Sequence, residues 1–574
     1  MLRRLWPYAG LLIWLPILFF ALFYFYPLGT IFKESFFDDG QLQLGALSNL
    51  LVTPHYRQVL WFTLWQAAFS TLLVLLLALP GAYVFARYRF RGKQTIRTIS
   101  TLPFVLPTIV VANAFLALIG TRGILNSALM NWFGFSSPPI NLQFTIWAIL
   151  LAHVFFNYSV ALRIISSAWQ NLGTDLGEAA QMLGASPRRV FWTVTLPLLQ
   201  PSIMAAAVLV FVFCFTSFGV VLILGGPRYA TLEVEIYRQA VNLFNLPVAA
   251  ALSIFQILFT FVFMVLYTRH QAADSRPLEL KSVEAIEKPV RTWRDRFIVG
   301  GNLLLMLLLL GLPLAALVLR SLQGMEGWTL RYYSELFVNR QDSIFFVPPA
   351  EAIFNSTAFA LTTVLLATLL GLISAWFLAG RDTELGPAPE QVRFVSRLQR
   401  VARPLLDPMF MLPLATSAVT LGFGFILALN RPPLNLRRSL LLVPIAHTLV
   451  ALPFVIRSVL PAIRRINPRL REAAATLGAD PQHVLLQVDW PLIRRALLVG
   501  AVFAFTISMG EFGATVFVAR PQTPTMPVAI YRFLGQPGSL NYGQAMAMSC
   551  LLMAVCAVGF VLIERFRIGD EGEF

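Results

Sequence analysis

The sequence predicts an all-α polytopic membrane protein of about twelve transmembrane helices. Of the 574 residues, 57% are hydrophobic and only 13% are charged, and the mean hydropathy is +0.71. A water-soluble domain cannot bury that much apolar surface in one core. The apolar residues form separate runs of roughly 20 to 25, the length that crosses ~30 Å of hydrocarbon. Lipid is therefore the expected solvent.

Each apolar run is expected to be a helix, because backbone groups in hydrocarbon must bond within their own segment. The twelve runs cover residues 10–32, 58–86, 98–120, 142–167, 200–224, 246–268, 297–320, 354–379, 404–429, 440–462, 495–519 and 545–564. The first run is too long for the apolar part of a signal peptide and lacks a small-x-small cleavage site. We expect it to be a retained first span.

The basic residues fall mainly on one side of these spans. The chain carries a net charge of +16, and alternate loops divide its 44 Lys and Arg residues into 31 and 13. This asymmetry follows the positive-inside rule and predicts that both termini are cytoplasmic. No soluble segment shows a basic stripe with interleaved aromatic residues, so nucleic-acid binding is not expected.

The chain repeats one pattern at a spacing of 294 residues, which predicts an internal duplication. The pattern comprises Glu178-Ala179-Ala180 with Gly184 and Pro197, and Glu472-Ala473-Ala474 with Gly478 and Pro491. At the same spacing His153 matches His447, Phe218-Gly219 matches Phe512-Gly513, and Ile236-Tyr237-Arg238 matches Ile530-Tyr531-Arg532. Leu106-Pro107 and Leu412-Pro413 are 306 residues apart, so loops of unequal length separate matching spans.

The duplication predicts the domain organisation. We expect a first six-span repeat at 1–268 with its repeated loop at 173–197, a cytoplasmic linker at 269–296, and a second repeat at 297–574 with its loop at 467–491. Six spans return the chain to its starting side. The two repeats are therefore expected to be parallel, related by an axis along the membrane normal, as in transporters that place a pathway between two halves.

Each repeated loop is predicted to form a helical elbow. Asn467-Pro468 is an N-cap followed by proline at the first helical position, and Gly478 is a left-handed helix stop. Asp480-Pro481 repeats the start signal, as does Ser186-Pro187 in the first copy. A surface hairpin whose glutamate only favours the first helical turns is the simpler alternative, but it does not explain why the element occurs twice.

The pattern Glu-Ala-Ala-x3-Gly-x9-Val-x-Leu-Pro at 178–197 resembles the EAA motif of bacterial ABC importer membrane subunits. It recurs at 472–491 with Trp490 where leucine is usual. Within that superfamily the chain resembles the fused double permeases of the thiamine and ferric-iron uptake group. The narrower resemblance is carried by segments 151–157, 214–219, 224–226, 235–237 and 508–513. Thiamine permeases are the more similar, although ferric-iron permeases share much of the pattern.

The resemblance implies a type I ABC importer permease fold and a division of labour among subunits. An extracytoplasmic binding protein would deliver a small solute, and two cytoplasmic ATPase subunits would bind ATP and Mg and dock on the elbows. This chain would hold no cofactor of its own and sit in the bacterial inner membrane. It lacks a G-x4-G-K-[S/T] phosphate loop, so it is not expected to be an enzyme. The implied coupling residues are Glu178, Ala179, Ala180, Gly184, Glu472, Ala473, Ala474 and Gly478.

Glu511 is the most informative candidate for the translocation pathway. A carboxylate within a span is costly, by roughly 2.5 to 3.5 kcal/mol, and usually faces a cavity or a partner. The matching residue is Ser217, so the charge breaks the symmetry between the copies. The alternative is a structural glutamate that is hydrogen-bonded between helices or paired with Arg520. The other candidate pathway residues are Ser217, Phe218, Gly219, Phe512, Gly513 and Asn157.

No metal site is predicted. Cys214, Cys550 and Cys556 all lie in apolar runs without paired spacing. His153 and His447 have no nearby cysteine or carboxylate at ligand spacing, so we interpret them as interhelical hydrogen-bonding residues.

Two other function classes remain as alternatives. A secondary transporter with 6 + 6 spans would carry coupling-ion acids in several spans, whereas the spans predicted here are nearly free of acids apart from Glu511. A polytopic membrane enzyme would need clustered His, Asp or Glu side chains, and the five histidines are scattered along the chain.

Overall fold

The computed structural model describes residues 12–38, 41–42, 45–173, 175–273, 287–324, 327–338, 347–380, 404–414, 416–430, 432 and 434–567. Among these residues, eleven helices are long and apolar enough to cross a membrane. A helix pair at Pro404–Leu414 and Ala418–Ala428, bent by 97°, gives a twelfth if it counts as one span. The all-α polytopic class is confirmed. The central part of the predicted linker, residues 274–286, lies outside the described residues.

The chain divides into two compact units. The first-repeat unit comprises residues 45–332, and the second-repeat unit comprises residues 1–44 and 333–574. These units do not coincide with the predicted repeats, because the first span lies in the second-repeat unit and the seventh span lies in the first-repeat unit. The boundaries 1–268 and 297–574 stay a prediction about the duplication.

Within its described residues, the first-repeat unit is helical and contains one parallel pair of short strands. Its elements are α4 (Gly45–Val52), α5 (Pro54–Arg87), β3 (Tyr88–Arg89), α6 (Lys93–Ile99), α7 (Leu102–Val105), α8 (Thr108–Ile119), α9 (Ile124–Phe133), α10 (Ile146–Asn171), α11 (Asp175–Met182), α12 (Pro187–Val190), η3 (Phe191–Thr195), α13 (Leu196–Phe215), α14 (Gly219–Leu224), α15 (Leu232–Tyr237), η4 (Arg238–Asn242), α16 (Leu246–Ala273), β4 (Lys288–Pro289), α18 (Trp293–Met306), η5 (Leu307–Gly311) and α19 (Leu312–Leu322).

The second-repeat unit begins with the N-terminal span and resumes after α20 (Arg331–Ser334), a short helix at the boundary. Its elements are α2 (Trp14–Phe20), η2 (Ala21–Phe25), α3 (Tyr26–Phe36), the antiparallel pair β1 (Phe37–Asp38) and β2 (Gln41–Leu42), η6 (Glu335–Phe337), α21 (Pro349–Leu378), α23 (Ala418–Ala428), α24 (Leu442–Arg465), α25 (Pro468–Thr476), α26 (Pro481–Val484), η8 (Leu485–Asp489), α27 (Trp490–Gly510), α28 (Thr515–Val518), α29 (Met526–Leu534) and α30 (Ser539–Arg567).

The first predicted span packs in the second-repeat unit, and the seventh predicted span packs in the first-repeat unit. Specific side-chain contacts hold both spans in place. In the second-repeat unit, the hydroxyls of Tyr24 and Thr416 lie 2.6 Å apart, and the ring centroids of Phe20 and Phe410 are separated by 5.2 Å. In the first-repeat unit, the Tyr88 hydroxyl donates to Asp295 at the start of α18 at 3.2 Å. Each unit therefore completes its core with a span that the sequence assigns to the other repeat.

Four spans contain a π-helical turn at one defined place relative to a proline. The turns η2, η3, η5 and η8 each end two residues before a proline, and these prolines are Pro27, Pro197, Pro313 and Pro491. Proline lacks the N–H that would bond to the preceding turn. The wider i→i+5 turn accommodates this loss while the span stays continuous. The two elbows therefore join their spans without a break.

Four runs predicted as continuous spans are interrupted among the described residues, and one of them, at 404–429, is the bent helix pair given above. The run at 98–120 breaks at Leu106, whose extended ψ of 142° is typical of a residue before proline. The run at 200–224 breaks between α13 and α14, and the run at 495–519 breaks between α27 and α28. The last two breaks occupy matching places in the two repeats. Hydropathy could not predict them, because tertiary hydrogen bonds hold them.

Candidate functional site: paired elbows and helix breaks

The first elbow consists of α11, a glycine turn and α12. Gly184 has φ +87°, a conformation that residues with a Cβ rarely adopt. Its N–H donates to Gln181 O at 2.9 Å, and the next N–H, of Ala185, donates to Ala180 O at 3.0 Å. This pair of bonds is the Schellman helix stop. The Ser186 side chain then caps the next helix by accepting from Arg189 N at 3.4 Å.

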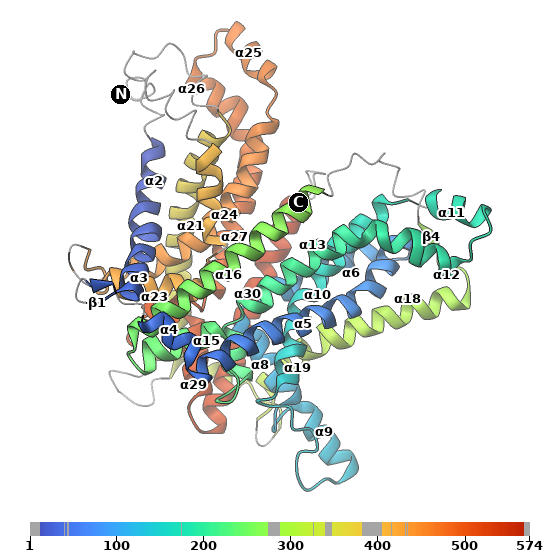
Figure 1. Ribbon diagram of the computed structural model, residues 1–574, viewed down its shortest axis with the longest axis horizontal. Coiled ribbons are helices and arrows are strands. Elements are labelled where there is room, and N and C mark those ends of the chain that lie inside the picture. Colours follow the sequence, from blue (N-terminus) through green and yellow to red (C-terminus); the bar gives the residue numbers. More distant parts are fainter. Residues whose placement is uncertain are drawn as a thin grey trace. The chain divides into compact units, whose positions relative to one another are not determined.

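The second elbow repeats this geometry between α25 and α26. Gly478 has φ +84°, and its N–H donates to Ala475 O at 3.0 Å. The N–H of Ala479 donates to Ala474 O, also at 3.0 Å. The Asn467 side chain caps α25 by accepting from Arg469 N at 3.1 Å. The predicted helix, glycine turn and second helix are therefore present in both copies, and Figure 1 shows α25 and α26 beyond the ends of α24 and α27.

The two elbows also expose the same positions. Glu178 and Ala179 are exposed and Ala180 is half-buried, and Glu472, Ala473 and Ala474 follow the same order. A leucine precedes each glycine, and these residues, Leu183 and Leu477, are 90% and 89% exposed. The two elbows therefore expose a leucine at the same place. The coupling role of the eight elbow residues stays a prediction.

The elbows differ in how they are anchored to their spans. In the second elbow Arg471 Nε lies 2.8 Å from Asp489 Oδ1, and both side chains are largely buried. The Arg471 guanidinium also lies 5.6 Å from the Trp376 ring centroid, within cation–π range. The matching residues of the first elbow are Gly177 and Thr195, which cannot form an ion pair. There, α11 approaches α12 closely enough that a Cβ at Gly177 would lie 3.4 Å from Val190 Cγ1.

Glu511 stabilises the helix break in the second repeat. Its two carboxylate oxygens accept from Ala514 N at 2.8 Å and from Thr515 N at 2.9 Å. The Thr515 hydroxyl donates to the same carboxylate, and His447 Nε2 lies 3.4 Å from it. This geometry matches the structural alternative, a buried glutamate hydrogen-bonded between helices. Its partners are these groups and not Arg520. A role in the pathway stays a prediction.

A histidine also spans the matching break in the first repeat. His153 Nδ1 lies 2.8 Å from the Ser70 hydroxyl, and Nε2 lies 2.9 Å from the Ser217 hydroxyl. His447 likewise reaches the hydroxyls of Ser508 and Thr515, each at 2.7 Å. Both histidines are interhelical hydrogen-bonding residues, as predicted.

The remaining pathway candidates line the same breaks and are mostly buried. Asn157 donates to His153 O at 3.0 Å, one turn away on α10. The Phe218 ring packs on Tyr237 with centroids 5.6 Å apart, and Phe512 packs on Tyr531 at 5.5 Å. Gly219 opens α14, and Gly513 lies beside Ala418. Each break is therefore in contact with the second helix that follows it, α15 or α29.

Sequence reasoning missed two buried acids on α15. Glu233 and Glu235 are each 2% exposed. The hydropathy pattern placed residues 225–245 outside the spans, although the matching Ile236-Tyr237-Arg238 and Ile530-Tyr531-Arg532 triplets had marked this segment. These two acids lie outside the predicted spans, so they do not contradict the expectation that the spans are nearly free of acids apart from Glu511. The matching residues of the second repeat are Pro527 and Ala529, so this pair of charges also breaks the symmetry.

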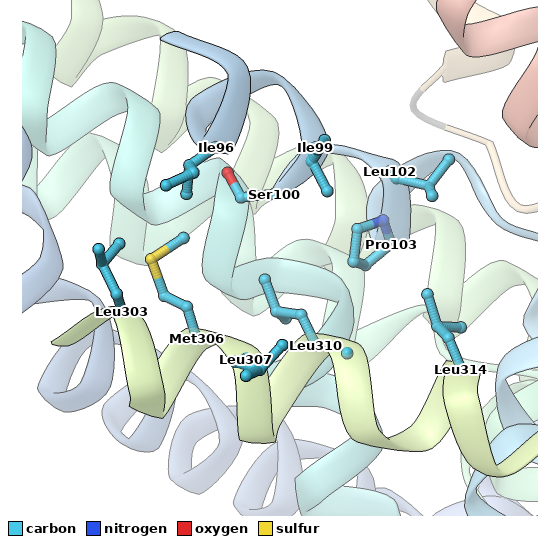
Figure 2. Close-up of a pocket in the computed structure, with 11 residues that line it drawn as sticks. Ile96, Ile99, Ser100, Leu102, Pro103, Leu303, Met306, Leu307, Leu310 and Leu314 are labelled. Carbon is cyan, nitrogen blue, oxygen red and sulfur yellow. The ribbon is translucent and has the colours of Figure 1, made fainter. Parts of the chain in front are cut away.

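The first-repeat unit contains an apolar cavity of about 270 Å³ between α6, α7 and the α18–α19 span. Figure 2 shows Leu303 and Met306 opposite Ile96, with Ser100 as a polar side chain in the lining. Such a lining offers few hydrogen bonds to a polar solute. The cavity is suited to hydrocarbon and is not a candidate pathway site.

A family profile decides the class of the protein. The profile described as "binding-protein-dependent transport system inner membrane component" matches residues 78–273 and again residues 367–567. The chain belongs to this family. The two matched segments each contain one elbow and one helix break, so the duplication covers both features. This transport-system component is a multi-pass inner-membrane permease of an ABC importer.

Curated relatives of this inner membrane component are similar along most of the chain. The thiamine transport system permease proteins of Brucella abortus and Escherichia coli K12 are 28% and 27% identical over 516 and 515 residues, covering 89% and 88% of this chain and 88% of each relative. That of Haemophilus influenzae is 25% identical over 566 residues, covering 98% of this chain and 97% of the relative. These relatives are permease subunits and not ATPases.

A solved structure of a bacterial ABC transporter that imports the acidic polysaccharide alginate matches 48% of this chain and 98% of that chain, with 18% identity and a TM-score of 0.40. The assignment to the binding-protein-dependent family is carried by the profile. This family assignment excludes the secondary-transporter and membrane-enzyme alternatives.

Proposed function

We propose that this permease forms the translocation pathway for thiamine, delivered by an extracytoplasmic binding protein. The observation that carries the proposal is the likeness to thiamine transport system permeases over 88–98% of the chain. Ferric iron is the competing solute, because the sequence segments that resemble thiamine permeases are partly shared with iron permeases.

The elbows support the second part of the proposal, which concerns the energy source of transport. Two cytoplasmic ATPase subunits would each bind ATP and Mg and receive one elbow. Glu178 and Glu472 would face the ATPase surface, the alanines would allow close helix packing, and the leucines before each glycine would be covered on docking. Since each elbow continues into its span through a π-turn and a proline, a push on α11 or α25 would move a spanning helix.

The orientation of the permease follows from the distribution of basic residues. We place both termini and both elbows in the cytoplasm, on the side that carries 31 of the 44 Lys and Arg residues. In the first-repeat unit, Arg87 at the end of α5 donates to Gly173 O beside the elbow at 2.7 Å. The opposite end of α5, at Pro54, would therefore face the binding protein.

Reconstitution tests the function directly. The permease is inserted into liposomes with its cognate ATPase and binding protein, and ATP-dependent uptake of labelled thiamine and of labelled ferric iron is measured. We expect thiamine uptake that requires all three components. Uptake of iron without thiamine would overturn the solute assignment, and uptake without the ATPase would overturn the proposed power source.

A further inference from the structure

A buried carboxylate on α15 of the first-repeat unit lies directly beneath a surface histidine. Glu235 Oε1 accepts from Gln239 Nε2 at 2.7 Å and lies 3.2 Å from His55 Nε2. The Glu235 side chain is 2% exposed, whereas that of His55 is 54% exposed. His55 is in the first turn of α5, where it can turn outward into solvent. One exposed side chain therefore separates this carboxylate from the surface.

Acceptors around this carboxylate outnumber donors among the described residues. Glu235 Oε2 and Gln239 Oε1 are buried and accept no hydrogen bond. Two further buried glutamines near α15 show the same pattern. Gln256 donates its amide to Glu233 at 2.5 Å and Gln66 donates to Cys214 O at 2.8 Å, and in both the amide oxygen is unpartnered. Buried polar atoms of this kind are rarely left unsatisfied in a native structure.

The positive charge of Arg238 only partly compensates the negative charge of Glu235. Arg238 Nη1 lies 4.0 Å from Glu235 Oε2, beyond hydrogen-bond distance, and Arg238 Nη2 donates instead to Gly226 O at 3.1 Å. A buried carboxylate is stabilised when it is both paired with a cation and hydrogen-bonded. An added group that supplies both a positive charge and N–H donors would meet these requirements.

His55 shows which shape of ligand fits beside Glu235. It presents a ring nitrogen to Glu235, and its ring lies 5.3 Å from the Tyr56 ring in an edge-on arrangement. A flat nitrogen heterocycle that takes the place of the imidazole would keep the contact with the carboxylate and the contact with the tyrosine.

We propose that Glu235, Gln239 and Tyr56 bind a cationic nitrogen heterocycle with N–H donors, which displaces His55 as the solute enters the permease. The proposal rests on the proposed transport function and assigns the chemical class of its solute. The described residues include no group of three or more His, Cys, Asp or Glu side chains arranged to hold a metal ion.

The position of the site along α5 is consistent with a solute entrance. His55 and Arg87 lie near opposite ends of α5, which at 34 residues is about 50 Å long. The site is therefore far from the elbow of its own unit and near the end at which solute would be delivered. The second repeat has Ala529 in the place of Glu235, so its matching position has no carboxylate.

Uptake kinetics of the reconstituted importer test the site. Glu235→Gln should raise the thiamine concentration for half-maximal uptake by roughly tenfold or more, since it removes a charge-assisted contact. Glu351→Gln is the matched control, an exposed acid in the first turn of α21 in the other unit. An unchanged half-maximal concentration in folded Glu235→Gln protein would overturn the proposal.

A labelling experiment needs no transport and keeps Glu235 in place. Cys214, Cys550 and Cys556 are all buried, so a His55→Cys variant of the purified permease should react with a maleimide mainly at position 55. We expect thiamine and protonated imidazole to slow this reaction, and tetramethylammonium, which has no N–H donor, to slow it much less.

The double variant His55→Cys/Glu235→Gln should lose the protection. Equal labelling rates with and without thiamine and imidazole, or equal protection in both variants, would contradict the site. If the wild-type importer fails to carry thiamine while imidazole still protects position 55, the solute assignment fails and the cation site stands.

Discussion

His447 Nε2 lies 3.4 Å from Glu511 Oε2 in the second-repeat unit, with both side chains buried. The pair joins α24 to the break between α27 and α28. In the first repeat, His153 meets the Ser217 hydroxyl at the matching place. The two breaks are thus held by one histidine each, but only one of them contains a charge.

Replacing Glu511 should separate its structural role from a pathway role. Glu511→Ala leaves the N–H groups of Ala514 and Thr515 without an acceptor, and we expect a loss of about 1.5 to 3 kcal/mol in stability. Thermal unfolding in detergent and hydrogen exchange over 511–518 measure this loss. Glu511→Gln, which keeps one acceptor, should lose less. If Glu511→Gln unfolds like the wild type but imports less solute per folded molecule, Glu511 lines the pathway.

Substitution of both elbow glycines should uncouple transport without preventing membrane insertion. An aspartate in the left-handed conformation of Gly184 and Gly478 costs about 1 kcal/mol or more per site and distorts the turn. We expect Gly184→Asp/Gly478→Asp to lower solute uptake severalfold and to weaken ATPase binding. Gly92→Asp is the control, because Gly92 has φ +76° in a turn outside the elbows. Normal uptake and normal ATPase binding in the double variant would refute the coupling role.

The Arg471–Asp489 ion pair should stabilise the second elbow alone. Arg471→Ala removes the cation that lies 2.8 Å from the buried Asp489 carboxylate, and losses of about 3 kcal/mol are typical of such changes. Hydrogen exchange should rise over 468–489 and stay unchanged over 175–195. The double variant Arg471→Ala/Asp489→Ala removes both charges and should recover part of the loss. A double variant no more stable than Arg471→Ala would show that the pair contributes little.

Cysteine accessibility should decide the orientation of the permease. Leu477→Cys would place a thiol at the tip of the second elbow, where the native side chain is 89% exposed. A membrane-impermeant maleimide should label it in permeabilised cells and not in intact cells. Trp132→Cys on α9, where the native side chain is 80% exposed, should react in intact cells. The opposite result for the two variants would reverse the predicted topology.

Much of the fold could be predicted from the sequence because its signals are local. A span is set by apolar length, and an elbow is set by a cap, a glycine and a proline within about 25 residues. Glu178 and Glu472 are exposed at matching places, and Gly184 and Gly478 have nearly the same φ, as the repeated pattern predicts.

The helix breaks could not be predicted in this way. The run at 200–224 carries no charged residue and stays apolar on average, so hydropathy alone does not predict that the helix ends at Phe215. The break exists because Ser217 bonds His153 on α10 and accepts from Thr231 across a turn of 14 residues. These partners become neighbours only after the spans have packed.

By itself, the sequence determined the solvent, the helical class, the duplication and the two elbows, since each depends on composition or on short spacings. Only the tertiary structure decided which spans share a core, how Glu511 is held and that Glu235 lies beneath His55. Tyr24 and Thr416 are 392 residues apart in sequence and 2.6 Å apart in space. Contacts of that kind depend on the packing of preformed helices, which no local pattern encodes.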